Sequence, residues 1–491
     1  MAAGHRVKSV EQSIRETDEP GHSLKKTLSA FDLTVFGVGV TIGTGIFVLT
    51  GQQAAVNAGP AVVLSFLLAG ITCAFAALCY AELASTVPVA GSAYTFAYAT
   101  LGEVVAWIIG WDLLLELMLG AAVVARGWSA YLQSLLDLPS WLAGDHARPD
   151  IAAIVVVLVL AAVLIRGSKT SSRLTGILVA IKIGVVLLVI VVGLAYVRTA
   201  NYHPFIPANQ PGAAGGAPGS TLSEPIVQAF LGLEPTSFGW FGIVAAASVV
   251  FFAYIGFDIV ATTAEETISP QRDLPRGILG SLAICTVLYM AVSAVITGMV
   301  PYGQLNTAAP LAEAFNKVGV TWASTVISLG AVAGITSVIL VLILGQSRVL
   351  FAMSRDRLLP SGLARVHPRF GTPWLNIAVI AVAVAALAGF VPLDALSKLV
   401  SIGTLFAFVV VCLGVLVLRR TRPDLPRAFR TPGVPVVPVL GVLACGWLML
   451  NLPVETWLRF LVWMAIGLVI YLTYGRRHSR FAERGSSGAV R

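Results

Sequence analysis

Long apolar runs recur along this chain and are separated by short polar segments. A helix needs about 20 apolar residues to cross a bilayer. The pattern predicts twelve spans, near residues 31–56, 61–86, 102–136, 151–166, 173–197, 240–264, 275–299, 321–352, 374–391, 394–418, 435–452 and 456–474. The runs at 102–136 and 321–352 are longer than a span requires, so we expect them to tilt or to extend past the membrane surface.

The first run contains residues that an uninterrupted membrane helix has no reason to place at its midpoint. The stretch from Val38 to Thr50 reads VGVTIGTGIFVLT and holds three glycines. Each glycine costs about 1 kcal/mol of helix propensity relative to alanine. We therefore predict a break at Gly43-Thr44-Gly45, where freed N–H groups at the start of a second half-helix would attract an anion. The alternative is a continuous packing helix whose small residues let a neighbour approach closely.

A second interruption is predicted in the sixth run. Residues 251–258 read FFAYIGFD, so that Gly256 interrupts an aromatic-rich helix at an offset of 213 residues from Gly43. Each break falls in the first span of a five-span half, and because five is odd the second half enters from the opposite face. Paired interrupted helices in two inverted halves are typical of transporters with a binding site at the bilayer midplane. Spans 11 and 12 would lie outside the repeat.

Composition agrees with a polytopic membrane protein and excludes other classes. Of the 491 residues 57% are apolar and only 11% are charged, against about 25% charged in soluble domains. The net charge of +8 comes from basic residues scattered among short loops, so we expect no nucleic-acid surface. The five cysteines lie within apolar runs without CxxC spacing and are expected to be packing residues. About thirty charged and polar residues precede the first run, unlike a cleavable signal peptide.

The positions of the basic residues predict the orientation. With the N-terminus inside, 25 of the 32 Lys and Arg residues lie on the inner side and five on the outer side, as the cytoplasmic excess of Lys and Arg requires. Both termini of a multi-pass protein in the cell membrane are thus expected to be cytoplasmic. The predicted regions are an N-terminal segment (1–30), a first five-helix repeat (31–197), an irregular outer loop (198–239), a second repeat (240–418), a basic inner loop (419–434), two further helices (435–474) and a tail (475–491).

Several of these stretches together resemble one superfamily. They include GTGIFVLTG from Gly43, GWDLLLE from Gly110, FFAYIGFDIVATTAEE from Phe251 and PQRDLPRGI from Pro270. With them the chain resembles the amino acid–polyamine–organocation (APC) superfamily, and more closely the cationic amino acid transporter family and its bacterial relatives. The resemblance covers about residues 24–472 and implies an all-α, LeuT-like fold with a 5+5 inverted repeat, broken helices 1 and 6, and alternating access.

Two residues depart from the pattern of this family. Thr41 stands where an apolar residue is usual, which is tolerable if only its backbone faces the substrate. Arg126 lies in the third span, where relatives are generally apolar, and the sequence offers no account of it.

The predicted substrate clamp uses backbone groups from both breaks. N–H groups of the first break, with the Thr44 hydroxyl, would hold a carboxylate, and carbonyls of the second break would hold an ammonium group. The resemblance assigns the same positions to binding. These positions are Thr41, Ile42, Gly43, Thr44 and Gly45 in the first break, and Phe252, Ala253 and Ile255 in the second. Core packing is the alternative role for the Phe252 side chain, and we expect Tyr254 and Phe257 to be packing or gate residues.

Lys182 is the most unusual single residue of the chain. It lies about nine residues into the fifth apolar run, which places it ~13 Å deep at 1.5 Å per residue. A buried ammonium is costly and marks a functional site by default in a membrane protein. We predict that Lys182 loses and regains a proton during transport, as the resemblance to proton-driven relatives implies. The alternative is that it reaches the interface by snorkelling.

We place four acidic residues inside the membrane, Glu82, Asp112, Glu116 and Asp258. Asp112 and Glu116 are four residues apart and so share one helix face. We expect Glu116 and Asp258 to tune the substrate site, and for Glu82 and Asp112 a structural hydrogen-bond network is the alternative role. Arg348 is expected to be a gate or ion-pair residue.

These features predict a secondary active amino acid transporter that uses protons. An exchanger that needs no proton is the alternative within transport, and a membrane-bound amino acid sensor is the alternative outside it. No HExxH, GxSxG or Walker motif and no metal-ligand cluster occurs in the sequence, so we predict no catalytic residue, metal or cofactor. The sequence identifies no protein partner beyond the bilayer.

The predicted substrate is a small or medium neutral L-amino acid such as alanine. The stretch from Gly334 to Leu342 in the eighth span is mostly Ile, Val and Leu, and bulky apolar groups there would shorten the pocket. Arginine or lysine remains the alternative, because Glu116 and Asp258 would be able to pair with a cationic side chain.

Overall fold

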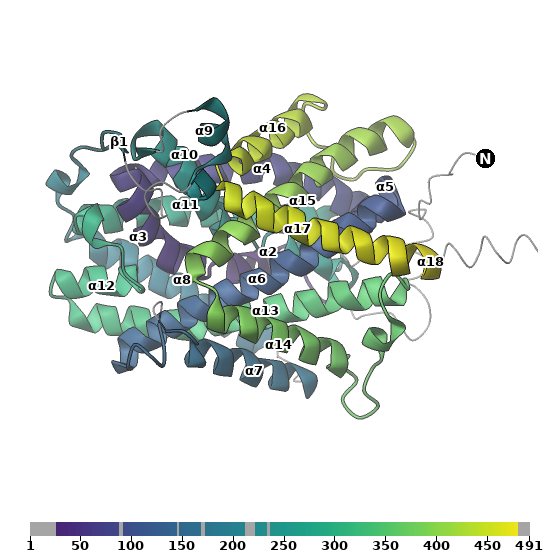
Figure 1. Ribbon diagram of the computed structural model, residues 1–491, viewed down its shortest axis with the longest axis horizontal. Coiled ribbons are helices and arrows are strands. Elements are labelled where there is room, and N and C mark those ends of the chain that lie inside the picture. The colour runs from purple at the N-terminus through teal and green to yellow at the C-terminus, as the bar shows by residue number, and fades with distance from the viewer. Residues whose placement is uncertain are drawn as a thin grey trace, which may run out of the picture.

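The structure is a computed structural model that describes residues 26–87, 92–144, 147–167, 172–211, 221–232 and 236–479. Its helices run mostly along the long axis of the molecule (Figure 1). Most of the predicted cytoplasmic segment 1–30 and the last twelve residues of the tail, 480–491, lie outside the described residues.

Ten of the predicted spans are each formed by one main helix. These are α4 (Val62–Thr86), α6 (Glu103–Leu136), α7 (Ile151–Ile165), α8 (Ser172–Leu194), α11 (Pro270–Met299), α13 (Thr321–Arg355), α14 (Trp374–Phe390), α15 (Leu393–Thr421), α16 (Val436–Leu450) and α17 (Val454–Ile470). Within the described residues, eight helical stretches are long and apolar enough to cross a membrane, and four shorter helices are also apolar. The chain is therefore a multi-pass, all-helical membrane protein.

The first and sixth predicted spans are divided into several helical pieces. The pieces of the first are α2 (Ala30–Thr41), the π-helix η1 (Gly45–Leu49), α3 (Thr50–Gln53) and the π-helix η2 (Ala54–Ala58), and those of the sixth are α10 (Gly239–Val250) and the 3-10 helices η6 (Phe251–Tyr254) and η7 (Ile259–Glu266). Both predicted interruptions are thus present as breaks in regular helix.

Several short elements were not predicted from hydropathy. They are α5 (Ser92–Thr100), α9 (Ile226–Leu231), α12 (Pro310–Lys317), α18 (Arg476–His478), the strands β1 (Gln210–Pro211) and β2 (Thr236–Ser237), and the short helices η3 (Gly59–Ala61), η4 (Thr199–Tyr202), η5 (Thr221–Ser223), η8 (Tyr302–Gln304), η9 (Ser361–Ala364) and η10 (Tyr471–Gly475). The loop 198–239, expected to be irregular, therefore holds α9 and a two-residue antiparallel pairing of β1 with β2. They were missed because each is too short to carry a periodic pattern.

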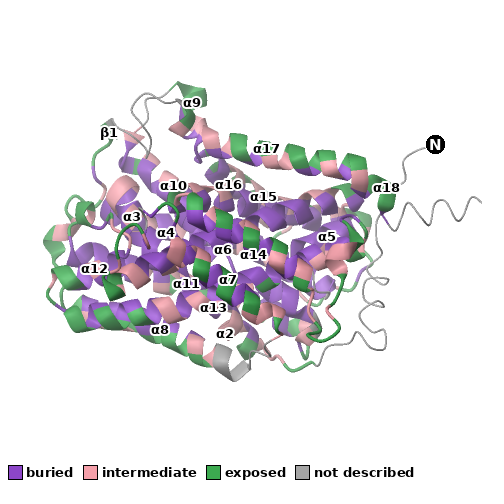
Figure 2. Cartoon of the chain, turned by 60° about the horizontal axis from the view of Figure 1, so that its bottom comes forward, coloured by how far each residue is buried: buried purple, intermediate pink, exposed green. Residues whose placement is uncertain are grey.

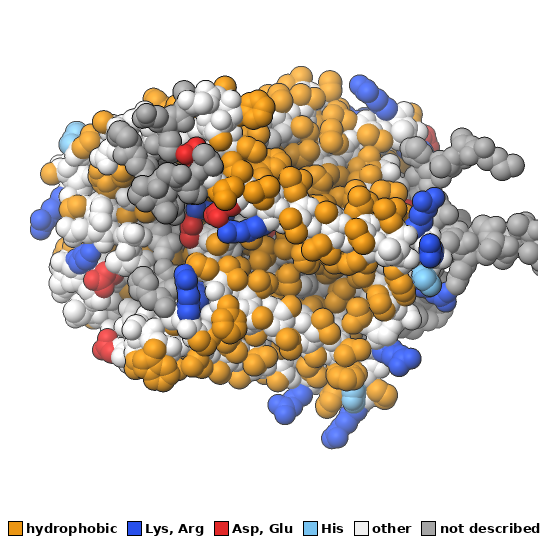
Figure 3. All heavy atoms as spheres, viewed as in Figure 1, with side chains coloured by type: hydrophobic (Ala, Val, Ile, Leu, Met, Phe, Trp, Pro, Cys, Tyr) orange, Lys and Arg blue, Asp and Glu red, His pale blue; other side chains and the backbone are white. Residues whose placement is uncertain are grey.

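The core lies around α6 and the divided sixth span. In the most apolar stretch of α6, 83% of residues are buried, against 89% for the stretch 239–264 and only 22% for the stretch that starts at Val454. Buried residues follow the middle of the bundle in Figure 2, whereas α17 presents exposed residues. In Figure 3 apolar side chains cover the middle of the molecule and charged ones gather toward both ends, the distribution expected where lipid surrounds the bundle.

Glu82 forms a structural ion-pair cluster at the end of α4. Its carboxylate accepts hydrogen bonds from Arg419 at 2.9 and 2.8 Å and from the Thr431 N–H at 2.7 Å. Arg427 lies 3.4 Å from the same carboxylate. The cluster ties α4 to α15 and to the segment that follows it, so of the two roles considered for Glu82 the structural one holds.

The structure explains Arg126, for which the sequence offers no account. Its buried guanidinium donates hydrogen bonds to the carbonyls of Ala388 at 2.9 Å, Gly389 at 3.4 Å and Ala147 at 3.0 Å. The first two belong to the last turn of α14, whose carbonyls have no partner within the helix. A positive charge there also complements the helix dipole. Arg126 therefore joins α6 to the end of α14.

Replacing Arg126 with methionine is expected to destabilise the protein by on the order of 3 kcal/mol, because buried carbonyls lose charged donors. The measurement is thermal unfolding of the purified protein in detergent. Arg148→Met removes an exposed arginine near the same end of the bundle and serves as the control. Equal unfolding temperatures for the two variants would contradict this role.

Candidate functional site

The first break begins one residue earlier than predicted. Helix α2 ends at Thr41, and Ile42 has extended backbone angles of φ −72° and ψ 96°. Thr44 has already returned to helical angles, with φ −54° and ψ −28°. The break is thus centred on Ile42-Gly43, and the prediction of Gly43-Thr44-Gly45 was shifted toward the C-terminus. The N–H groups at the start of the second piece have no partners within the helix, as at any helix start.

The second break is centred on Ile255-Gly256. Ile255 is extended, with φ −62° and ψ 129°, and Gly256 has φ +131°, which L side chains rarely adopt. The Asp258 carboxylate accepts a hydrogen bond from the Gly256 N–H at 3.1 Å. Asp258, predicted to tune the substrate site, therefore holds the turn of the break itself.

The two breaks touch each other inside the bundle. A Cβ atom on Gly45 would lie 2.4 Å from the Ala253 Cα, and one on Gly256 would lie 2.9 Å from the Thr41 nitrogen. Distances this short mean that glycine is required at both positions. The structure thus brings together the two sets of backbone positions that the sequence predicted as one clamp.

Tyr289 on α11 joins the carbonyl groups of both breaks and was not predicted. Its hydroxyl oxygen lies 2.7 Å from the Thr41 carbonyl and 2.9 Å from the Ala253 carbonyl. A hydroxyl has one proton, so Tyr289 donates to one of these carbonyls at a time. The Phe252 carbonyl accepts from the Ile255 N–H at 3.2 Å. Each carbonyl retains a second lone pair for a further donor.

The side chains around the first break differ in part from the prediction. The Thr44 hydroxyl, expected to hold a carboxylate, donates to the Val124 carbonyl of α6 at 3.4 Å. The Thr41 hydroxyl oxygen is buried and has no hydrogen-bond partner among the described residues. A Cβ atom on Gly43 would lie 3.6 Å from Val338 of α13, so the apolar stretch Gly334–Leu342 does face the break.

Lys182 is fully buried, and the snorkelling alternative is wrong. Its ammonium donates a hydrogen bond to the Gly39 carbonyl of α2. Its methylene chain covers Gly334 of α13, where a Cβ atom would lie 2.6 Å from the Lys182 Cγ. The lysine therefore connects α8 to the helix that ends at the first break, two residues beyond Gly39.

Asp112 and Glu116 lie on the buried face of α6. The carboxyl oxygens of both residues have no hydrogen-bond partner in the part of the chain that the structure describes. One Asp112 oxygen would lie 3.0 Å from a Cβ atom on Gly403 of α15. The carboxyl group of Glu116 interacts electrostatically with that of Asp258. Because Asp258 accepts the hydrogen bond from Gly256, the structure brings these two predicted residues close to the second break.

Arg348 has a partner that the sequence could not identify. Its guanidinium lies 3.5 Å from the Glu266 carboxylate at the end of η7. The Glu266 carbonyl accepts backbone hydrogen bonds from Thr27 and Leu28, which precede α2. The far ends of both broken spans and α13 are therefore joined at this end of the molecule.

A membrane bundle in which two interrupted helices meet beside a buried lysine has the construction of a transporter for small solutes. The chain belongs to the amino acid permease family, whose sequence model matches residues 28–472. Family members are transporters and not enzymes, and the predicted resemblance to the APC superfamily is confirmed.

The chain is similar over almost its whole length to several characterised proteins. It is 46% identical to the branched-chain amino acid permease BcaP of Bacillus subtilis over 97% of this chain and 99% of the relative. It is 45% identical to the methylthioribose transporter of the same organism, over 93% and 95%. A vacuolar cationic amino acid transporter 4 of Arabidopsis thaliana is 33% identical, over 96% of each chain. Because these names cover different substrates, similarity alone does not define the substrate of this chain.

Proposed function

We propose that this protein is a secondary active transporter in the cell membrane that moves neutral L-amino acids together with protons by alternating access. The observation that carries the proposal is the connection between Lys182 and the first break. The ammonium is bonded to Gly39, two residues before α2 ends at the freed backbone of the clamp. A change in the protonation of Lys182 would therefore act directly on the helix that binds substrate.

The proposed fold is a LeuT-like arrangement of twelve spans with a 5+5 inverted repeat. Its support is the packing of the helices. A contact between one helix of the first half and one of the second recurs between their equivalents with the two halves exchanged. The pair α2–α11 has its counterpart in α10–α4, and the pair α6–α15 in α13–α8. The pairs α4–α11, α6–α13 and α7–α14 join equivalent helices of the two halves. The two breaks then occupy equivalent positions, as an inverted repeat requires.

In the proposed orientation, the end of the bundle at which α2 begins faces the cytoplasm. Described arginines at that end include Arg166, Arg355, Arg420 and Arg476, which lie at or just beyond the ends of α7, α13, α15 and η10. An excess of basic residues marks the cytoplasmic side.

The proposed substrate is a small or medium neutral amino acid, from alanine to the branched-chain amino acids. The freed N–H groups and carbonyls of the two breaks complement a carboxylate and an ammonium group, which every amino acid has. Val338 faces Gly43 from α13 and supplies an apolar surface for the side chain. Two relatives, 46% and 39% identical, are named branched-chain amino acid permeases.

Transport of arginine or lysine is the second candidate. The observation that favours it is the pair Asp112 and Glu116, whose buried carboxyl groups have no partner within the described residues. Two relatives, 33% and 41% identical, are named vacuolar cationic amino acid transporters.

Uptake into proteoliposomes tests the proposal. Purified protein is reconstituted, and uptake of radiolabelled alanine, leucine and arginine is measured with and without an imposed inward proton gradient. We expect accumulation of alanine or leucine that requires the gradient. Uptake that occurs only into vesicles preloaded with amino acid would identify an exchanger. Accumulation of arginine alone would reverse the substrate assignment. Binding of an amino acid without transport would identify a sensor.

The variant Gly43→Val tests the clamp. The position has room for a methyl group, because a Cβ atom would lie 3.6 Å from Val338, so Gly43→Ala should fold, and the unfolding temperature of Gly43→Val is measured beside its binding. Its further methyl groups would fill the space between the break and α13. We expect amino acid affinity to fall at least about tenfold, equivalent to 1.4 kcal/mol, with a smaller loss for Gly43→Ala. Affinity measured by equilibrium binding that equals wild type would disprove the clamp.

A further inference from the structure

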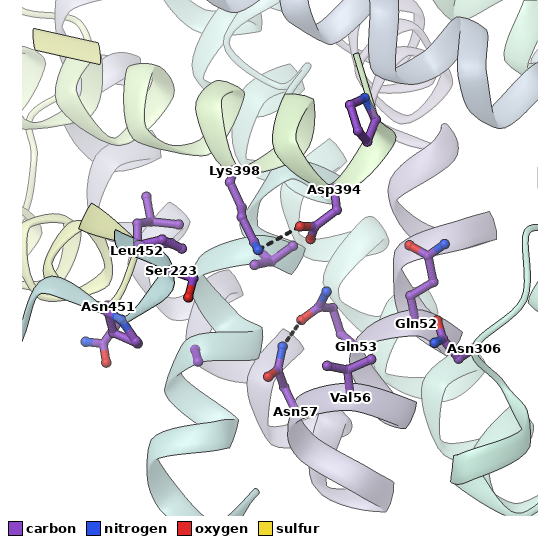
Figure 4. Close-up of a pocket in the computed structure, with 15 residues that line it drawn as sticks. Gln52, Gln53, Val56, Asn57, Ser223, Asn306, Asp394, Lys398, Asn451 and Leu452 are labelled. Carbon is purple, nitrogen blue, oxygen red and sulfur yellow. Dashed lines mark hydrogen bonds and ion pairs between the residues drawn. The ribbon is translucent and has the colours of Figure 1, made fainter. Parts of the chain in front are cut away.

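A cavity opens at the end of the bundle opposite to the start of α2. Its volume is about 270 Å³, and it lies between α3, η2, α10, the beginning of α15 and the segment 451–453 (Figure 4). Val249 of α10 lines it, three residues before Phe252 of the second break. The cavity therefore comes within about one helical turn of the second break.

One wall of the cavity carries a pair of opposite charges. Lys398 and Asp394, one turn apart on α15, form an ion pair of 2.7 Å and point toward Gln53 (Figure 4). The Lys398 side chain is 12% exposed and that of Asp394 is 52% exposed. A zwitterionic ligand can exchange this one ion pair for two ion pairs with itself. Its carboxylate can bind the Lys398 ammonium, and its ammonium group can bind the Asp394 carboxylate.

Carboxamide groups extend the polar wall. The Asn57 amide donates to the Gln53 side-chain oxygen at 2.6 Å, which leaves the Gln53 NH₂ group to donate to a ligand. Asn451 donates to the Trp447 carbonyl at 2.8 Å, which leaves its own oxygen as an acceptor. The cavity thus offers a neutral donor and a neutral acceptor in addition to the two charges.

The remaining wall is apolar and firmly held. Val56, Ala245, Val249 and Leu452 contribute aliphatic surface. Leu452 belongs to a segment that is joined to the outer loop by backbone hydrogen bonds, from Ile226 N–H to the Leu452 carbonyl at 3.1 Å and from Val454 N–H to the Glu224 carbonyl at 3.0 Å. These hydrogen bonds hold the apolar wall in place, so it can contact an aliphatic side chain of a ligand.

We propose that this cavity is an outer recognition site for neutral aliphatic L-amino acids, occupied before the substrate reaches the clamp between the two breaks. Lys398 binds the α-carboxylate, Asp394 binds the α-ammonium group, and Val249 and Leu452 contact the side chain. This proposal rests on the proposed function, because it assigns to the cavity the same class of substrate as the central clamp.

Equilibrium binding of radiolabelled leucine to the purified full-length protein tests the site. We expect wild type to bind leucine with two different affinities. Lys398→Gln should lose only the weaker component, and Gly43→Val only the tighter one. In proteoliposomes, Lys398→Gln should raise KM by about tenfold, as for the loss of one charge-assisted contact, while kcat falls by a smaller factor.

The exchanged pair Asp394→Lys with Lys398→Asp separates recognition from structure. This variant keeps an ion pair on α15 but reverses the charges relative to the apolar wall. The exchange also moves the cation into the first turn of α15, where it opposes the helix dipole, so the unfolding temperature is measured together with KM. If the pair only stabilises α15, the exchange lowers the unfolding temperature but leaves KM at the wild-type value, which would overturn the proposal. If the pair orients a zwitterion, KM stays raised.

The binding experiment also separates this proposal from the proposed function. A single component that disappears in Gly43→Val and is unchanged in Lys398→Gln would overturn the outer site and leave the transporter assignment intact. The absence of any amino acid binding to wild type would overturn both.

Discussion

Lys182→Ala is expected to abolish the accumulation of amino acids that a proton gradient drives. In the structure the Lys182 ammonium is fully buried and donates a hydrogen bond to the Gly39 carbonyl. A charge-assisted hydrogen bond is roughly twice as strong as a neutral one, so loss of the proton weakens the connection between α8 and α2. Protonation can then shift the population of conformations in which α2 is held against the bundle. Without the lysine, the gradient has no effect on that equilibrium.

The measurement is the ratio of internal to external alanine or leucine at steady state in proteoliposomes with an imposed pH gradient. Wild type should exceed the ratio reached by equilibration, and Lys182→Ala should only equilibrate. Lys182→Met preserves most of the side-chain volume over Gly334, so it should show the same loss without the packing defect that alanine introduces.

Two further variants give this experiment its controls. Lys182→Arg keeps a permanent charge that cannot be released, and it should also fail to accumulate substrate. Lys317→Ala removes an exposed lysine whose ammonium donates to the Gln304 carbonyl at 2.7 Å, and it should accumulate like wild type. Undiminished accumulation by Lys182→Met would show that another group carries the proton, and Glu116 would be the next residue to replace.

The sequence predicted the spans well because long apolar runs depend on local composition alone. The helices α6, α13 and α15 begin and end within a few residues of the predicted runs. The two breaks were also accessible, because glycines in the middle of a membrane helix require an explanation. The exact centre of the first break could not be predicted, because Ile42 adopts extended backbone angles that any residue can take. Of the residues at the centres of the two breaks, it is Gly256 whose positive φ requires glycine.

Contacts between distant segments were not accessible from one sequence. Arg126 bonds to Ala388, 262 positions away, and Tyr289 bonds to Thr41, 248 positions away. From the sequence one could predict that the Tyr289 hydroxyl has a hydrogen-bond partner, because a tyrosine within an apolar helix needs one, but not which groups these partners are. Its partners are carbonyls that become free only when the two helices break, so the break had to be known first. The outer cavity likewise combines residues from six separate segments, none of which carries a recognisable motif.

Gly256→Ala is expected to abolish transport and to lower the stability of the protein. The φ of +131° at Gly256 is unfavourable for any L side chain, and such strain costs roughly 1–3 kcal/mol. The added methyl carbon would also lie 2.9 Å from both the nitrogen and the hydroxyl oxygen of Thr41. The backbone nitrogen cannot move without moving the end of α2, so the substitution pushes the two breaks apart.

The control for Gly256→Ala is the same substitution at Gly184 of α8. No atom lies within 4 Å of a Cβ atom built on Gly184, and alanine is the better helix former by about 1 kcal/mol. Gly184→Ala should therefore keep wild-type uptake and an equal or higher unfolding temperature, whereas Gly256→Ala should lose both uptake and equilibrium binding of leucine. Wild-type uptake by Gly256→Ala would mean that the contact between the breaks is not required in the transport cycle, and the backbone clamp would have to be replaced by a site built from side chains.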